Sequence, residues 1–227
     1  MRKLDHDPRS RHTRQMTSRP RKMDPKGKRA AILDAAERLF AARGFVGVTI
    51  AEVAAEAVVA VGTVYRLFPD KPALLAALHA RMEDRFISVM LSAWERTPDH
   101  RVRLGAMVDA LLTEALALAP LMPLYSLTRD IVGEVHYRPG ERTIAAIIPL
   151  YEEGKRAGAF TEMNASLAAR VAYAMVDGAM QTLLQSAPRV QKRLQAQAIG
   201  AVERAFLAPA EQCCSSSETR DRLMPCR

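Results

Sequence analysis

The residues best suited to chemistry lie in a short run from Val61 to Arg66, and the chemistry they suit is contact with a nucleic acid. The guanidinium of Arg66 can pair with a guanine edge or hold a phosphate, while the hydroxyl and methyl group of Thr63 suit several bases. Gly62 would let a nucleic-acid strand come close to the backbone. We therefore take Val61, Thr63 and Arg66 as candidate base-reading positions, and Gly62 as a DNA-contacting position that permits close approach of the backbone.

Three further side chains around this run can hold phosphates. The phenol of Tyr65 can donate a hydrogen bond to a phosphate and fix the register of a duplex, although a partly packed ring would look the same in the sequence. Lys71 begins the next predicted helix, where its ammonium and the free backbone N–H groups both attract phosphate. Thr49 begins the preceding helix, and a role as helix cap explains it as well as a phosphate contact does.

Helical periodicity predicts the elements that position these side chains. Apolar residues recur at helical spacing over residues 32–40, and Gly44 follows as a C-terminal stop. Thr49 and Glu52 have the spacing of a capping box, which predicts that a second, short helix begins there.

A third short helix follows a tight turn. Val64 and Phe68 stand four residues apart and are expected to face inward, which leaves the candidate contact residues on other faces. Asp70 can cap a fourth helix that continues to about residue 95. Two short helices joined by a tight turn predict a helix-turn-helix.

The composition favours an all-α protein. Apolar residues make up 49% of the 227 residues and aromatic residues only 5%, with little strand-like alternation. No apolar run reaches the roughly 18 residues that a membrane span needs, and the N-terminus lacks the apolar region of a secretory signal. We expect a cytoplasmic protein without a membrane partner.

The formal net charge of +8 is concentrated at the N-terminus. Residues 1–29 hold eleven bases and three acids, which accounts for the entire excess. Prolines and few large apolar residues predict a disordered basic arm over residues 1–26. The arm adds non-specific phosphate attraction or serves only as a solubilising leader.

The C-terminal residues 209–227 are polar and predicted to be disordered. All the cysteines lie there: Cys213, Cys214 and Cys226. Their spacing is not that of a zinc site, and free thiols suggest a reducing compartment. His100 and His136 have no partner at metal spacing, so we interpret them as lone surface histidines and expect no metal.

The order "ILDAAERLFAARGF", "TIAEVAAEA" and "GTVYRLFPDKPALL" resembles the DNA-binding domain of the TetR family of bacterial transcriptional regulators. The resemblance covers about residues 28–78, roughly a quarter of the chain. It implies a helix-turn-helix domain over residues 27–78 and a larger helical effector-binding and dimerisation domain over residues 79–208. It also implies a homodimer on a palindromic operator, a small-molecule effector and no cofactor.

The effector pocket implied by this resemblance would be lined by methionine and aromatic side chains, which suit an adaptable apolar cavity. An apolar residue on a helix is also ordinary core. Small residues at Ala168, Ala172, Gly178 and Ala179 would permit close approach of helices in a dimer, or ordinary packing within one subunit. Candidate pocket residues are Trp94, Met107, Leu111, Met122, Tyr125, Tyr137 and Met175.

The chain departs from the family pattern at the turn. Val58 stands where the family commonly has glycine, and Ala60 where it commonly has serine. A positive φ at Val58 would cost roughly 1–2 kcal/mol, and alanine at an N-cap about 0.5–2 kcal/mol. The fold should survive, but the recognition helix could fray and DNA binding could weaken.

Three functions therefore stay open. The first is a ligand-responsive repressor, and the second a ligand-binding dimer of the same fold with weakened or lost DNA binding. The third is an enzyme that uses the helical cavity, but the sequence has no Ser/His/Asp order, phosphate loop, metal cluster or H-E-x-x-H motif, so we expect no catalytic residue.

Overall fold

The computed structural model describes residues 24–132 and 140–209. In these ranges the regular elements are all helices, apart from one isolated bridge between Phe160 and Leu207, and the expected all-α fold class is confirmed. The helices are α1 (Pro25–Arg43), α2 (Ile50–Glu56), α3 (Val61–Leu67), α4 (Lys71–Arg96), α5 (His100–Ala117), η1 (Ala119–Leu121), α6 (Met122–Val132), α7 (Glu141–Arg156), α8 (Ala165–Leu184) and α9 (Pro188–Phe206).

Three short-range signals set the helix boundaries in the N-terminal part as predicted. Thr49 and Glu52 form the capping box of α2, and the Asp70 side chain accepts a hydrogen bond from the N–H of Ala73 at the start of α4. Gly44 ends α1 with φ 73°, a conformation that favours glycine. These local signals fix where the chain turns.

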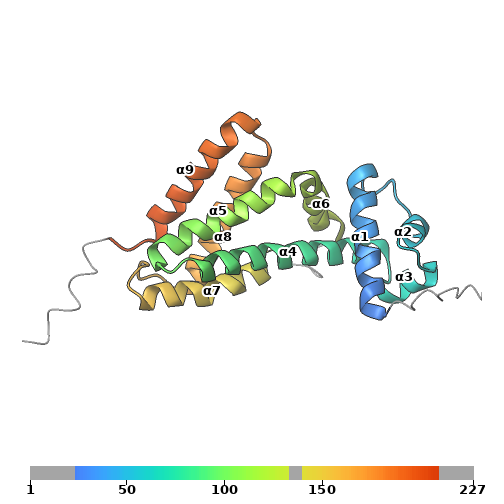
Figure 1. Cartoon of the computed structure of the whole chain (residues 1–227), viewed down its shortest axis with the longest axis horizontal. Coiled ribbons are helices and arrows are strands. Elements are labelled where there is room, and N and C mark those ends of the chain that lie inside the picture. The colour runs from blue at the N-terminus through green and yellow to red at the C-terminus, as the bar shows by residue number, and fades with distance from the viewer. Residues whose placement is uncertain (1–23, 133–139, 210–227) are drawn as a thin grey trace, which may run out of the picture.

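Helices α1, α2 and α3 gather at one end of the molecule, and α4 runs from them along the remaining helices, with α5 above it and α7 below it in the view of Figure 1. We call α1–α3 with the first two turns of α4 the N-terminal head. Its core is filled with fully buried apolar side chains, among them Ile32, Val53, Val64 and Leu74. The expected inward orientation of Val64 and Phe68 is confirmed.

The remaining helices surround a second core. Helix α4 packs against α5, α7 against α8, and α9 against both α5 and α8. Gly154 in α7 lies against Phe160, and a Cβ atom there would come within 2.3 Å of the ring, so this contact requires glycine. Among the described residues no single helix is long and apolar enough to cross a membrane.

The core of the head is continuous with the second domain. The same buried cluster extends along α4 to Met82 and Phe86 and includes Leu118, Leu124 and Tyr125 from the η1–α6 region. Figure 1 shows α6 lying next to α1, where the two domains meet. Most of the predicted basic arm and polar tail, including the three cysteines, lies outside the described residues.

Candidate nucleic-acid interface and ligand cavity

Helix α3 turns one face into the head and the other outward. Val64 is fully buried and Phe68 is 2% exposed, while Tyr65 is 51% exposed. Val61, Gly62 and Arg66 are also exposed, and Thr63 is half-buried at the flank of this face. The structure therefore brings the candidate base-reading residues and Tyr65 together on α3.

Gly62 has no structural role that would require glycine. Its φ is not positive, and a Cβ atom built on it would meet nothing within 4 Å. Glycine inside a helix costs about 0.5–1 kcal/mol relative to alanine. The bare backbone at this point thus leaves room for a partner outside the chain.

The turn before α3 has the geometry expected from the sequence. Val58 has φ 54° and is the single described non-glycine residue with positive φ. The N–H of Val58 bonds to the Ala55 carbonyl at 3.1 Å, and the N–H of Val59 to the Ala54 carbonyl at 2.9 Å. These bonds form a Schellman motif with valine at the position that favours glycine. Ala60 is the N-cap of α3 and supplies no side-chain bond.

Thr49 is held within its capping box. Its hydroxyl accepts from the Glu52 N–H at 3.2 Å and lies 2.7 Å from the Glu52 carboxylate, which also accepts from the Thr49 N–H at 2.7 Å. The backbone bond to Thr49, followed by bonds to its hydroxyl and to Arg43, lowers the pKa of Glu52 to about 2. Capping accounts for the Thr49 side chain, and its contact with phosphate stays a prediction.

Lys71 has a structural role that the sequence did not reveal. Its ammonium lies 4.3 Å from the centre of the Phe45 ring, 5.8 Å from that of Phe40 and 3.4 Å from the carbonyl oxygen of Val46. Burial lowers the pKa of Lys71, and the charge of Glu52 opposes this shift. Lys71 thus ties the α1–α2 loop to the start of α4, and its predicted phosphate contact stays untested.

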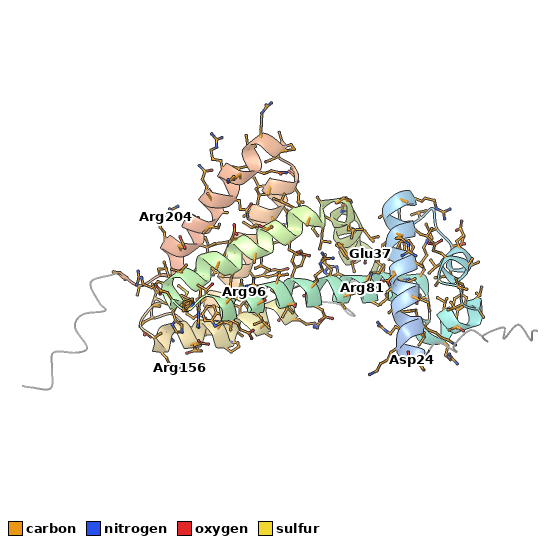
Figure 2. The ribbon with its side chains drawn as sticks, in the orientation of Figure 1. Asp24, Glu37, Arg81, Arg96, Arg156 and Arg204 are labelled. Atoms are coloured by element: carbon orange, nitrogen blue, oxygen red, sulfur yellow. The ribbon has the colours of Figure 1, made fainter. Side chains whose placement is uncertain are left out.

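An ion-pair cluster joins the head to α4. Arg81 donates to Asp34 at 2.5 Å, to Glu37, and to the carbonyl oxygen of Leu33 at 3.5 Å. Burial opposes its charge, but the hydrogen bonds to Glu37 and Asp34 prevail and raise the pKa of Arg81. Figure 2 shows Glu37 and Arg81 together where α1 meets α4. Nearby, burial foremost and then the Glu37 charge raise the pKa of Tyr125 to about 12.

A cavity of about 640 Å³ lies between α4, α5, α6, α7 and α8. Of the predicted pocket residues, Met107, Leu111, Met122 and Tyr125 line it, whereas Tyr137 lies outside the described residues. Trp94 and Met175 do not line it. Both pack against the second core instead. The sequence could not separate the two roles, because an apolar residue on a helix has the same pattern in a pocket wall and in a packed core.

The sequence analysis missed two polar residues of this cavity, His79 and Glu83 of α4. Both are buried, at 8% and 4% exposed. They lie four residues apart, one helical turn, between the buried residues Leu75 and Phe86. Polar residues within an apolar helix stripe were the signal that could have identified them.

Trp94 and His100 belong to a polar cluster on the other side of the second core. The indole N–H of Trp94 donates to Glu153 at 3.3 Å, and Nε2 of His100 lies 3.0 Å from the same carboxylate. Arg103 donates to Glu153 at 2.6 Å. The bond to His100, partly opposed by burial, lowers the pKa of Glu153 with help from Arg103 and Trp94. The interpretation of His100 as a lone surface histidine was therefore wrong; His136 lies outside the described residues.

The exposed face of α8 differs from the small-residue face expected for a dimer. Ala168 is fully buried, and Ala172 and Ala179 pack partly against the second core, so these three point inward. Gly178 is exposed, and a Cβ there would meet nothing within 4 Å. An exposed apolar stripe instead contains Leu167, Val171, Ala174 and Gly178. No group of three or more potential metal ligands occurs in the described part of the chain.

Comparison with known proteins identifies the head. Residues 32–78 match the family described as "Bacterial regulatory proteins, tetR family". The HTH-type transcriptional repressor KstR of Rhodococcus jostii (strain RHA1) is 39% identical over 101 residues, which are 41% of this chain and 48% of the relative. The chain thus spans about half the length of the curated relative that it matches.

Solved structures share the fold over most of the chain. A TetR-family transcriptional regulator from Pectobacterium atrosepticum has a TM-score of 0.65 and 19% identity, with 82% of this chain and 95% of the other covered. A TetR-family protein from Vibrio parahaemolyticus has a TM-score of 0.56 and 27% identity, with coverage of 80% and 100%. The helical C-terminal domain thus has the architecture of these proteins.

Proposed function

We propose that this chain is a transcriptional repressor of the TetR family of bacterial regulatory proteins, because residues 32–78 match the model of that family and most of the chain has the fold of its solved members. A small molecule bound in the C-terminal domain releases it from a palindromic operator. One observation carries the proposal: the matched segment presents an exposed α3 face with Tyr65 and Arg66 over a fully packed core. The domain limits are residues 27–78 and 79–208, and the protein acts in the cytoplasm.

Helix α3 enters the major groove of the operator. Val61, Thr63 and Arg66 meet base edges, and the bare backbone of Gly62 permits the close approach. Tyr65 bonds a phosphate and fixes the register. Thr49 and Lys71 stand at the N-termini of α2 and α4, where backbone N–H groups reinforce attraction of phosphate.

The repressor is a homodimer formed through α8. Its exposed stripe of Leu167, Val171, Ala174 and Gly178 can pack against the same stripe of a second copy, which makes an isologous interface. The exposed fractions of Leu167 and Val171, 54% and 39%, are high for large apolar residues and support this assignment. The dimer sets two α3 helices at the spacing of two operator half-sites.

Ligand occupancy reaches the head through α4 and α6. His79 and Tyr125 line the cavity, and their rings meet edge to face at 5.6 Å. Arg81 lies two residues beyond His79 on α4 and binds Asp34 and Glu37 of α1. A ligand that moves Tyr125 or His79 therefore acts on side chains adjacent to the pairs that hold the head.

The proposed activity is binding rather than catalysis, and it needs no cofactor. The rival with the same fold, a ligand-binding dimer without DNA binding, predicts that the exposed α3 face has no partner. Strain at Val58 and the missing cap at Ala60 favour that rival, because both weaken the start of α3.

A gel-shift and footprint experiment with the DNA upstream of the protein's own coding region separates these functions. We expect a protected palindrome at low salt. Tyr65→Phe and Arg66→Ala should each weaken binding, whereas Arg96→Ala, an equal loss of charge at the far end of α4, should not (Figure 2). Absence of any protected site would refute the repressor and favour the rival.

A further inference from the structure

The wall of the cavity combines apolar side chains with carboxylates. Glu83 of α4 and Asp177 of α8 both line it, and the described lining residues include neither lysine nor arginine. His79 is the one basic side chain among the described lining residues, and Phe86, Met107 and Met180 represent the apolar part of the wall. A low-dielectric interior strengthens the attraction of a carboxylate for positive charge and its repulsion of negative charge.

Glu83 is fixed in place by the start of α7. Its Oε1 accepts a hydrogen bond from the N–H of Gly140 at 3.0 Å, and both residues are buried. Gly140 has φ 83°, and a Cβ atom there would lie 2.3 Å from the ring of Tyr173. The positive φ and the nearby ring both favour glycine here, so the backbone that holds the Glu83 carboxylate is supported by the sequence.

Asp177 adds a second negative charge from a different helix. Its carboxylate accepts from the amide of Gln181 at 2.8 Å, one turn further along α8. Both residues line the cavity, so a ligand would meet a carboxylate on α4 and another on α8. A volume of about 640 Å³ accommodates a drug-sized molecule with a large apolar part.

On the basis of the proposed function, we propose that the effector is a cationic amphiphile: an apolar body with a positively charged amine head. The body contacts the methionine and phenylalanine walls, and the head binds between Glu83 and Asp177. A ligand with a free carboxylate or phosphate would place like charges together in an apolar cavity, and the site disfavours it.

Calorimetric titration of the full-length protein with three probes of equal chain length tests this assignment. The probes are decylamine, decan-1-ol and decanoate, each below its micelle-forming concentration at pH 7. We expect decylamine to bind about tenfold more tightly than decan-1-ol, and decanoate to bind more weakly than either. Decanoate binding as tightly as decylamine, or no binding by any probe, would overturn the proposal.

Variants locate the charge preference. Glu83→Gln keeps an oxygen that can accept from Gly140 and should abolish most of the preference for decylamine, while Asp177→Asn should reduce it less. Glu95→Gln, the same change at an exposed position of α4, should leave all three affinities unchanged. If Glu83→Gln does not fold, as judged by helicity, the test relies on Asp177→Asn. A folded variant at either position that keeps the full preference for decylamine contradicts the proposal.

The probe titrations need no DNA, so the two proposals fail separately. A protein that shifts an operator but prefers decanoate would retain the repressor function and lose the ligand class assigned here. A protein that prefers decylamine but protects no palindrome would retain the ligand class and lose the repressor function.

Discussion

In the N-terminal head the residues proposed to contact DNA point away from the core, whereas in the C-terminal domain the residues proposed to bind the effector point into it. Val64 and Phe68 fill the inner face of α3, and Tyr65 and Arg66 occupy the outer face. In the second domain the side chains that face inward surround a cavity of about 640 Å³. A fully packed core can hold the outer face of α3 in one conformation. A core that contains a cavity can change the packing of its helices when a ligand binds there.

The largest expected effect comes from truncating one phenylalanine in each region. Phe68→Ala should destabilise the protein by about 3–5 kcal/mol, because it leaves a hole in a filled core. Phe86→Ala should cost less, because Phe86 lines a cavity and already lacks contacts on that side. Denaturant unfolding measures both; equal losses would mean that the cavity wall is packed as tightly as the head.

Arg81→Met breaks the connection between the two regions. It leaves Asp34 and Glu37 without their shared guanidinium and should cost about 1–2 kcal/mol. The effect should appear in scanning calorimetry as earlier melting of the head. Arg38→Met removes an exposed pair with Glu56 inside the head and should cost less than about 1 kcal/mol.

The turn before α3 is the weak point of the filled region. Val58→Gly with Ala60→Ser should stabilise the head by about 1.5–4 kcal/mol, since it removes left-handed strain and adds a cap. It should also tighten operator binding. Val46→Gly is the control, because Val46 is equally exposed, at 88% against 86%, without a positive φ. If Val46→Gly raised the free energy of unfolding and the operator affinity as much as the change at the turn does, strain at Val58 would not explain the gain.

Gly62→Ala should separate stability from recognition. Alanine should raise helix stability by about 0.5–1 kcal/mol, because nothing in the chain lies within 4 Å of the added Cβ. Operator affinity should nevertheless fall, since the methyl group would stand where we propose that the bare backbone approaches DNA. Thermal unfolding and gel shift measure the two effects; unchanged DNA binding would exclude Gly62 from the interface.

The smallest effect is a pH dependence of the head. Glu52 has a pKa of about 2 in the folded protein, below its usual 4.5, so its contribution to stability is present above pH 4.5 and is lost as the pH falls toward 2. Glu52→Gln should flatten the decline in melting temperature over this range. Because Glu52 is exposed, an effect comparable to that of Phe68→Ala would contradict this assignment.

The head could be predicted from the sequence because local signals there coincide with the site. A capping box at Thr49, a glycine stop at Gly44 and the spacing of Val64 and Phe68 each act over a few residues. The positive φ of Val58 agrees with the family pattern, which commonly has glycine at this position. Lys71 shows the limit, since its aromatic partners lie far back in the sequence, Phe40 in α1 and Phe45 on the loop after it, and no local pattern reports those contacts.

The cavity could be predicted only in part, because a pocket wall and a packed core use the same residues at the same spacing. Met107 and Tyr125 line the cavity, but Met175 and Trp94 of similar character do not. Which helix face borders empty space depends on how α4 to α8 meet in three dimensions. Glu83 was recognisable only as a charge inside an apolar stripe.

Helix α4 is one unbroken rod of 26 residues that begins in the filled head and ends within the core of the cavity-containing domain, where Trp94 is buried. At 1.5 Å per residue it is about 39 Å long, so a tilt of about 5° moves one end by about 3 Å relative to the other. Two heads that must reach successive grooves tolerate little such error. If the proposed dimer binds its operator as inferred above, the rod acts as a lever arm that converts a rearrangement of side-chain size around Glu83 and Tyr125 into a misfit on the scale of a DNA groove.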